Sequence, residues 1–271
     1  MYGAIIGDLA GSIYEFEQTK KVTNISINNI IENNSFYSDD TILTIAIADA
    51  VLNNKDYEKY LRYYIKKYFS YRPNFEPYFK TSFSPGLIKW ANSDLPGQSI
   101  GNGAMMRISP IGFMFDSYDE VIENARLATI PSHNSEEAIA AATKIALIIF
   151  YLRTGLTKEE IYNKLDIKLQ YTPFKKFNLT CNETIDNCLY AFYHSNGFED
   201  AIRKIIYMGG DTDTNACIVG AMAEAAYGIN DKLIETANKK IPSEFKKILS
   251  KTLIKVWTTT ESKVLIELWY N

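Results

Sequence analysis

The sequence predicts an all-α protein, a compact orthogonal helical bundle in which residues 1–271 form a single domain. Three observations predict this fold. Apolar residues recur at helical spacing along most of the chain. Alternating strand patterns are scarce, and the best candidate, residues 21–30, is weak. Several apolar segments are rich in Ala and Gly, which allows helix axes to approach closely in a dense bundle.

The expected helices follow one another along the chain. Residues 39–53 carry apolar side chains at helical spacing, and residues 57–69 repeat the pattern with a charged face. Residues 134–155 begin on a run that resembles a capping box, Asn134–Ser135–Glu136–Glu137. Further helices are expected at 117–130, 157–165, 182–209, 214–228, 230–241 and 243–257. Loops are expected at 72–86, 92–103 and 171–178, where turn-forming residues gather.

Composition limits the classes of partner. The formal net charge of −3, without a strongly basic block, argues against nucleic acid or a membrane surface as the main partner. The N-terminus lacks a basic start and carries Asp8, so it does not resemble a signal peptide, and no apolar run has the length of a membrane span. Cys181, Cys188 and Cys217 lack CxxC spacing, which indicates a reduced compartment. We expect a cytoplasmic monomer that has no membrane partner.

The stretch MGGDTDTNACIVGAMAEAAYG, residues 208–228, places four oxygen-bearing side chains in front of an apolar helix. One of them would suffice to cap the helix, where an acid also complements the helix dipole. Asp211, Thr212, Asp213 and Thr214 exceed that need, and two carboxylates this close repel each other unless a cation or water separates them. Taken alone, the stretch is equally consistent with metal binding and with elaborate capping.

A second stretch has the same design. Ser38, Asp39, Asp40 and Thr41 stand at the start of the helix expected at 39–53. Two clusters of acids and hydroxyls, each opening a buried helix, are interpreted as two halves of one site. Carboxylate and hydroxyl oxygens are hard ligands, which suit Mg²⁺, Mn²⁺ or Ca²⁺ and not Zn²⁺.

Weaker candidates lie in three other segments. The segment GAIIGDLAGSIYEFE has glycines at helical spacing together with Asp8 and Glu15, and Asp8 is interpreted as a surface acid on a tightly packed helix. The backbone of Gly101–Asn102–Gly103 can approach a phosphate or a sugar closely, although this tripeptide is also common turn chemistry. His133 stands just before a helix, where a histidine is more often structural than catalytic.

Taken together, five segments resemble the ADP-ribosylglycohydrolase family. In chain order they are GAIIGDLAGSIYEF, SDDT, GNGAMMRISPIG, SHNSEEA and GGDTDT, and they extend from about Gly3 to Gly228. The paired SDDT and GGDTDT motifs are specific, and the other three support them. The resemblance implies an all-α fold with a dinuclear Mg²⁺ or Mn²⁺ centre between helix N-termini.

The resemblance also implies roles for individual residues. It implies metal ligation by Ser38, Asp39, Asp40, Asp211, Asp213 and Thr214. It implies contacts to ADP-ribose by Gly101, Asn102, Gly103 and His133. Glu15 matches an acid that lies near the metals in some relatives, and a carboxylate among Glu15, Asp39 and Asp40 is expected to transfer the proton. Thr212 is expected to cap the helix.

Two positions depart from the family pattern. Many relatives have a serine between the second glycine of the glycine loop and its Met-Arg pair, where this chain has Ala104 and Met105. Many also have a second histidine after the first, where this chain has Ser135. Both departures leave the expected metal ligands unchanged. They concern how the phosphates and the distal ribose are held and which acceptor is preferred.

The predicted function is metal-dependent hydrolysis that removes ADP-ribose from an ADP-ribosylated acceptor. The expected acceptor is an arginine- or serine-linked protein, the expected product is free ADP-ribose, and the expected cofactors are two divalent cations, Mg²⁺ or Mn²⁺. Two alternatives stay open: a catalytically inactive ADP-ribose-binding module, and a helical protein stabilised by Ca²⁺. The intact acid clusters count against the first alternative, and the missing DxDG…E calcium loop counts against the second.

Overall fold

The computed structural model of the chain describes residues 1–15, 28–73, 81–174 and 177–254. Regular structure in these ranges is helical, apart from two isolated β-bridges that pair Gln98 with His133 and Gly101 with Thr180. The all-α prediction is therefore confirmed. Most of the candidate strand at 21–30 lies outside the described residues. Among the described helices, none is both long and apolar enough to cross a lipid bilayer.

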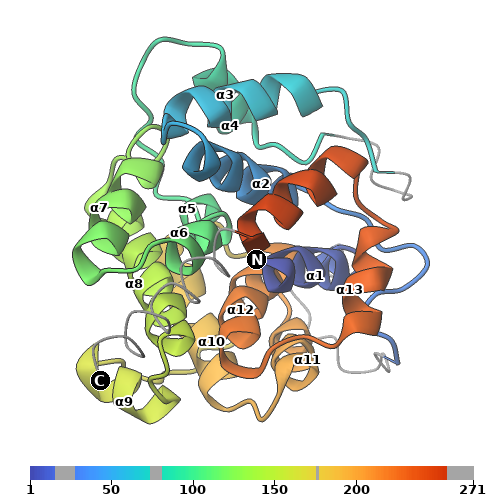
Figure 1. Ribbon diagram of the computed structural model, residues 1–271, viewed down its shortest axis with the longest axis vertical. Coiled ribbons are helices and arrows are strands. Elements are labelled where there is room, and N and C mark those ends of the chain that lie inside the picture. Colours follow the sequence, from blue (N-terminus) through green and yellow to red (C-terminus); the bar gives the residue numbers. More distant parts are fainter. Residues whose placement is uncertain (16–27, 74–80, 175–176, 255–271) are drawn as a thin grey trace, which may run out of the picture.

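Figure 1 shows the helices of the bundle in chain order, from blue at the N-terminus to red near the C-terminus. They are α1 (Tyr2–Gly11), α2 (Asp39–Leu52), α3 (Tyr57–Tyr68), α4 (Pro85–Ala91), α5 (Gly103–Met106), α6 (Ser109–Met114), α7 (Tyr118–Thr129), α8 (Glu136–Arg153), α9 (Lys158–Lys164), α10 (Cys181–Tyr193), α11 (Phe198–Met208), α12 (Thr212–Tyr227) and α13 (Asp231–Asn238). Residues 243–254 are also helical. Two of these helices, α4 and α5, begin inside segments that were expected to be loops.

The pair α1 and α12 makes the most extensive helix–helix contact of the bundle, near the centre of the view in Figure 1. These helices approach closely because α1 presents glycines to the backbone of α12. A Cβ atom added to Gly7 would lie 2.0 Å from the carbonyl oxygen of Ala216, and one added to Gly11 would lie 2.1 Å from that of Thr212. Every residue of α1 is buried, so this helix has no solvent-facing side.

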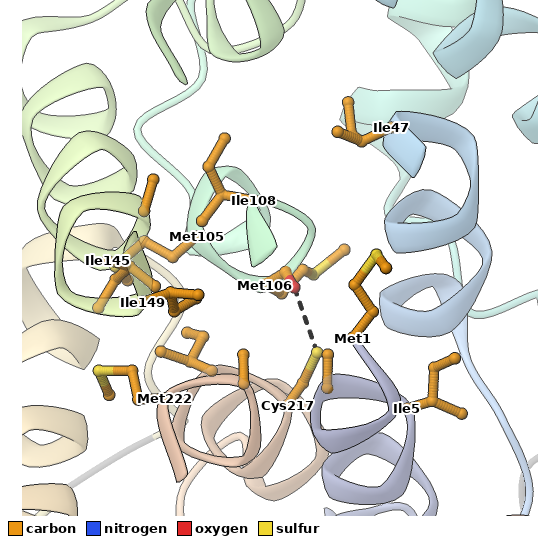
Figure 2. Close-up of a cluster of buried hydrophobic side chains, with 14 of the residues drawn as sticks. Met1, Ile5, Ile47, Met105, Met106, Ile108, Ile145, Ile149, Cys217 and Met222 are labelled. Carbon is orange, nitrogen blue, oxygen red and sulfur yellow. Dashed lines mark hydrogen bonds between the residues drawn. The ribbon is translucent and has the colours of Figure 1, made fainter. Parts of the chain in front are cut away.

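The hydrophobic core surrounds this helix pair. Apolar side chains from α1, α2, α5, α8 and α12 meet in the region shown in Figure 2. There the Cys217 thiol of α12 donates to the backbone carbonyl of Met106 at 3.2 Å, which joins α12 to the short helix α5. All three cysteines, Cys181, Cys188 and Cys217, are buried as free thiols. The core thus fixes the position of α12, whose N-terminus carries the second acid motif.

Serine side chains cap the helices α2 and α8. Ser38 Oγ accepts from the backbone N–H of Asp40 at 3.2 Å, and this bond starts α2. Ser135 Oγ accepts from the N–H of Ala138 at 3.2 Å, and this bond starts α8. The capping box expected at 134–137 is incomplete, because the third residue of the helix is alanine and cannot return the bond.

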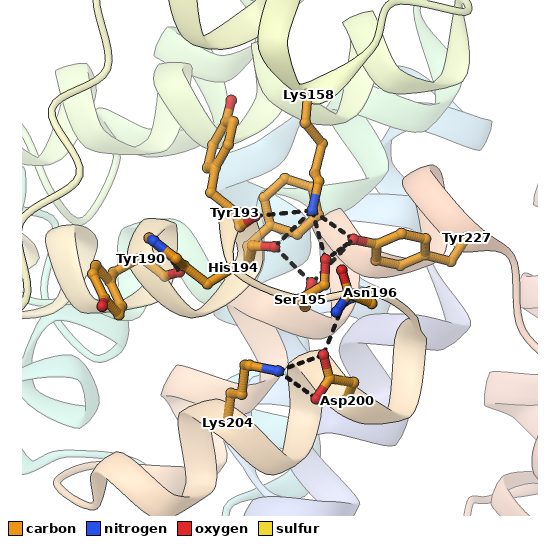
Figure 3. Close-up of polar contacts among 10 residues, drawn as sticks. Lys158, Tyr190, Tyr193, His194, Ser195, Asn196, Asp200, Lys204 and Tyr227 are labelled. Carbon is orange, nitrogen blue, oxygen red and sulfur yellow. Dashed lines mark hydrogen bonds and ion pairs between the residues drawn. The ribbon is translucent and has the colours of Figure 1, made fainter.

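The expectation of one helix across 182–209 is wrong, because the chain turns between α10 and α11. Lys158 stabilises the end of α10 at this turn (Figure 3). Its Nζ donates to the carbonyls of Tyr193 at 3.0 Å and Ser195 at 2.7 Å, and to the Tyr227 hydroxyl at 2.7 Å. A cation in this position satisfies helix-end carbonyls and complements the helix dipole.

The close approach of α1 and α12 predicts a strong effect of Gly7→Ala. The added methyl group would overlap the backbone at Ala216, and a backbone cannot move as a flexible side chain can. We expect the free energy of unfolding to fall by about 1–3 kcal/mol or more, the usual cost of overpacking a core. Urea denaturation measures the change. The matched control is Gly86→Ala in α4, where an added Cβ meets nothing within 4 Å; equal stability losses in both variants would contradict the close-packing argument.

Candidate metal centre

The two acid motifs meet at the N-termini of α2 and α12. Asp40, Asp213 and the α1 residue Asp8 form a group in which one carboxylate oxygen from each lies within 4.8 Å of the others. Glu15, Asp211 and Asp213 form a second group within the same limit. Asp213 belongs to both groups, so the five carboxylates form one continuous cluster, which is called the acid cluster below.

The interpretation of Asp8 as a surface acid is wrong. Its side chain is fully buried, and its Oδ2 accepts from the N–H of Ser38 at 2.9 Å and from the N–H and hydroxyl of Thr41 at 3.1 and 2.5 Å. These bonds join α1 to the first turn of α2. The sequence did contain a signal for this, because an acid in a helix that is apolar on all sides has no exposed face to occupy.

Hydroxyl groups bind the two motifs to each other. The hydroxyls of Ser38 and Thr214 donate to Asp40 Oδ2 at 3.1 and 3.3 Å, and the second of these bonds joins residues 174 positions apart. Thr212 is not the helix cap that was expected. Its hydroxyl donates to the carbonyl of Gly11 at 2.8 Å and so ties the start of α12 to the end of α1.

Asp39 lies differently from its neighbour Asp40. Its side chain is partly exposed and lines the cleft described below, but it belongs to neither group of three. Successive residues of a helix point in different directions, so the Asp39–Asp40 pair serves two surfaces. Asp40 faces the buried acid cluster, and Asp39 faces the open space beside it.

The acids raise one another's pKa. Burial raises the pKa of Asp8 to about 7 and that of Glu15 to about 9, and repulsion from Asp213 adds to both shifts. Burial followed by repulsion from Asp213 also raises the pKa of Asp39, Asp40 and Asp211 well above the usual range. A positive charge placed among these groups would favour their ionised forms and oppose both effects.

The residues of the acid cluster fit divalent cations. The two groups offer carboxylate oxygens alone, the hard donors that Mg²⁺ and Mn²⁺ prefer. Asp8 Oδ1 and Asp40 Oδ1 are buried and have no hydrogen-bond partner among the described residues. Buried acceptors without partners are costly, so each is an atom that an ion or an ordered water would satisfy.

A cleft of about 1340 Å³ opens onto the acid cluster. Most of the residues singled out from the sequence line it: Glu15, Asp39, Asp40, Gly101, Asn102, Gly103, His133, Asp211, Asp213 and Thr214. Ser38 does not line the cleft, and its hydroxyl contacts the cleft residue Asp40. Phe83, Trp90, Phe177 and Leu179 supply an apolar part of the wall. This lining suits a ligand that has both polar and apolar parts.

Asn102 connects the glycine loop, residues 101–103, to the acid cluster. Its Nδ2 donates to Asp211 Oδ2 at 2.7 Å and to the carbonyl of Asn178 at 3.2 Å, and its backbone N–H donates to the carbonyl of Leu179 at 2.9 Å. These bonds hold the loop at a fixed distance from the acids. Backbone at 101 and 103 therefore faces the cleft from a rigid support.

His133 lies against the glycine loop. A Cβ atom added to Gly101 or Gly103 would lie 3.5 Å from its Nε2 in either case. His133 does not cap α8, because Ser135 does. Burial lowers the pKa of the His133 ring well below its usual range, and the nearby Arg107 lowers it further, so the ring is neutral at pH 7.

Arg107 is a second residue, besides Asp8, whose burial the sequence analysis did not predict. It follows α5, lines the cleft and is only 1% exposed. Its signal in the sequence was a single arginine within an otherwise apolar run, GAMMRISPIG, which is as consistent with a surface position as with a buried one.

Comparison with curated proteins gives weak but long similarities. The chain is 22% identical over 280 residues to the "ADP-ribosylarginine hydrolase Tri1" of Serratia proteamaculans, covering 87% of this chain and 74% of that protein. It is 22% identical over 305 residues to the human "ADP-ribosylhydrolase ARH3", covering 84% of each. It is 26% identical over 145 residues to the "ADP-ribosyl-[dinitrogen reductase] glycohydrolase" of Rhodospirillum rubrum, covering 48% of this chain and 47% of that protein.

The fold is similar to that of a solved structure described as an "ADP-ribosylglycohydrolase-related protein complex". The TM-score is 0.63 at 20% sequence identity, and the match covers 94% of this chain and 93% of the other. The sequence model of one family, described as ADP-ribosylglycohydrolase, matches residues 1–263. Because that match covers nearly the whole chain, this protein belongs to the ADP-ribosylglycohydrolase family.

Proposed function

We propose that this chain is a metal-dependent glycosidic-bond hydrolase that removes ADP-ribose from an arginine- or serine-linked protein. The bond cleaved is that between the acceptor and the anomeric carbon of the neighbouring ribose. The observation that carries the proposal is that acids of the cluster line the same cleft as the glycine loop and His133. The names of the relatives support the reaction class. We further propose a cytoplasmic monomer with one domain, residues 1–271.

Two divalent cations, Mg²⁺ or Mn²⁺, are the proposed cofactors. Six residues would hold them: Ser38, Asp39, Asp40, Asp211, Asp213 and Thr214. Cations bound there supply positive charge that can orient the vicinal hydroxyls of the ribose and acidify a water molecule. Asp8 supports this set indirectly, because it holds the backbone of Ser38 and Thr41 and so aims the acids between them.

The glycine loop and His133 are proposed to bind the ADP-ribose. Backbone without side chains at Gly101 and Gly103 allows close approach of a phosphate or ribose oxygen. Asn102 is not free to move with the ligand, since its side chain is bonded to Asp211 and Asn178. We therefore assign Asn102 the task of holding the loop in place, with ligand contacts made by the backbone beside it and by His133.

Proton transfer is assigned to Glu15, Asp39 or Asp40. Departure of the acceptor leaves an oxocarbenium-like centre at the anomeric carbon, and attack by water requires that a proton be removed. Asp40 Oδ2 already accepts two hydroxyl hydrogen bonds. Glu15 and Asp39 line the cleft and are only partly buried, so they are better placed to exchange a proton with a bound substrate.

Release of ADP-ribose from a panel of substrates tests the proposed function. The panel contains arginine-linked, serine-linked and terminal-phosphate-linked ADP-ribose, each with Mg²⁺, with Mn²⁺ and with a chelator. Release from one or both protein linkages, lost in the chelator, is the expected outcome. Binding of free ADP-ribose without turnover of any substrate would instead favour the inactive binding module, and neither binding nor turnover would favour a purely structural role for the cation.

The acid cluster predicts that the metal-free protein loses stability as pH rises. The pKa of Asp8 in the folded chain is about 7, against 3.8 for the free side chain, so the folded state binds more protons between these values. The stability contributed by this group is complete below the lower value and is lost as pH rises through the higher one. We expect the gain in melting temperature on adding one fixed concentration of Mg²⁺ to be larger at pH 8 than at pH 5.5. A concentration of 100 times the Kd at pH 8 would stabilise the fold by about 2.7 kcal/mol at that pH. An equal gain at both pH values would contradict the proposal that the cation binds to these acids.

Asp213 is the acid shared by both groups, so Asp213→Asn is expected to abolish turnover while the fold is retained. The backbone N–H of Thr214 donates a hydrogen bond to Asp213 Oδ1 at 2.8 Å, and the amide oxygen of the asparagine can still accept it. Because one source of repulsion is removed, the metal-free variant is expected to melt at or above the parent temperature. The control is Asp186→Asn on the exposed face of α10. Parental turnover by Asp213→Asn at limiting Mg²⁺ would exclude Asp213 from the reaction.

Glu15 and His133 are expected to respond differently to substitution. Glu15→Gln should lower kcat strongly and leave ADP-ribose affinity nearly intact, since proton transfer is needed only in the transition state. His133→Ala should weaken ADP-ribose binding by about 1–3 kcal/mol, the loss of one hydrogen bond to a charged group. Calorimetric affinity measured beside turnover separates the two roles. Full turnover by Glu15→Gln would assign the proton transfer to Asp39 or Asp40. Unchanged affinity in His133→Ala would show that His133 does not bind the ligand.

A further inference from the structure

The guanidinium of Arg107 is buried and forms no salt bridge with an acid in the part of the chain that the structure describes. Its Nη2 donates to the Ser132 hydroxyl at 2.7 Å and lies 3.3 Å from Nδ1 of His133. Its Nε and Nη1 have no hydrogen-bond partner among the described residues. Burial lowers the pKa of Arg107 to about 10, so the group is still charged at pH 7. A buried cation with two unpaired donors lowers the stability of the fold. A role beyond packing would account for the presence of Arg107 at this position.

The position of this cation decides which ring nitrogen of His133 carries the proton. A guanidinium has donors and no acceptor, so it can share a hydrogen bond with Nδ1 only when Nδ1 is unprotonated. The Ser132 hydroxyl lies 2.8 Å from the same Nδ1, and a hydroxyl can either donate or accept. Ser132 therefore accommodates both tautomers, whereas Arg107 accommodates one. The contacts at Nδ1 therefore favour the neutral tautomer whose proton lies on Nε2.

The protonated nitrogen is the one that faces the glycine loop. Nε2 would lie 3.5 Å from a Cβ atom added to Gly101 and 3.5 Å from one added to Gly103. Among the described residues, the hydrogen bonds of the His133 ring involve Nδ1 only. The Nε2–H group is thus an unused donor at the wall of the cleft, beside backbone that lacks side chains.

We propose that Arg107 is a positioning residue that holds His133 in the neutral tautomer with its proton on Nε2, so that the ring always offers a donor to an oxygen of the ligand on the glycine loop. The identity of that ligand as ADP-ribose rests on the proposed function. The tautomer itself does not, because it follows from Arg107, Ser132 and His133 alone. Arg107 acts through the ring, since it is almost fully buried and its Nη2 contacts Nδ1 of His133.

Nitrogen-15 NMR of the full chain tests the tautomer directly. The sequence has two histidines, so His194→Gln, on the exposed end of α10, leaves His133 as the single source of ring signals. At pH 7 we expect Nδ1 to resonate as an unprotonated nitrogen and Nε2 as a protonated one. A protonated Nδ1 in this protein would overturn the proposal without any further variant.

Two substitutions in the same background separate Arg107 from Ser132. Arg107→Met removes the charge and the donors, so both tautomers should become populated and the two nitrogen signals should move toward each other. Ser132→Ala leaves the guanidinium in place, so the Nε2–H tautomer should persist. Loss of that tautomer in Ser132→Ala, with the Arg107→Met spectrum unchanged, would assign the control to Ser132 and overturn the proposal.

Affinity for ADP-ribose supplies a second readout. Arg107→Met is expected to weaken binding about twofold, because the tautomer that can donate from Nε2 falls to about half of the population. In a His133→Ala background the same substitution should cause no further loss, because residues that act through one contact are not additive. Arg153→Met is the matched control, since Arg153 bonds carbonyls at the end of α6 and does not line the cleft. Additive losses would show that Arg107 acts independently of His133. If the parent does not bind ADP-ribose, the proposed function fails and the NMR result alone decides the role of Arg107.

Discussion

The close packing of α1 against α12 is the constraint on which the rest of the site depends. Glycines at 7 and 11 allow the two backbones to approach to a distance that no side chain would permit. That approach places Asp8 near Asp213 and lets the Thr212 hydroxyl reach the carbonyl of Gly11. The second acid motif is therefore held by close backbone packing together with the hydrogen bond of the Thr212 side chain.

Bringing the acids together lowers the stability of the metal-free fold. Burial and mutual repulsion raise the pKa of several carboxyl groups. The dipoles at the N-termini of α2 and α12 favour negative charge, and they offset part of this rise. The hydrogen bonds that Asp8 accepts from the first turn of α2 compensate one oxygen of one acid. The remaining cost is the physical reason to expect cations here, since positive charge would convert the repulsion into binding energy.

The other wall of the cleft is organised by a separate polar network. Asn102 bonds Asp211 and the backbone near Asn178, so the glycine loop and the acid cluster are held as one unit. On the far side of the loop, Arg107 and Ser132 bond the buried nitrogen of His133. A rigid glycine loop between the acid cluster and a neutral donor is suited to a ligand that carries both hydroxyls and anionic oxygens.

The sequence by itself determined the helical class, most helix positions and the two acid motifs, because these depend on local patterns: apolar periodicity, capping residues and the clustering of acids beside hydroxyls. The resemblance to one family added the glycine loop and His133. Tertiary structure alone decided the rest. Asp8 was interpreted as a surface acid, and its burial depends on the helices that pack around α1, which are α2, α11, α12 and α13. Thr212 bonds α1 and does not cap its own helix, and Lys158 from another helix bonds the carbonyls at the turn between α10 and α11. Arg107 acquires its role from a contact with His133, 26 positions away in the chain, which no local pattern records.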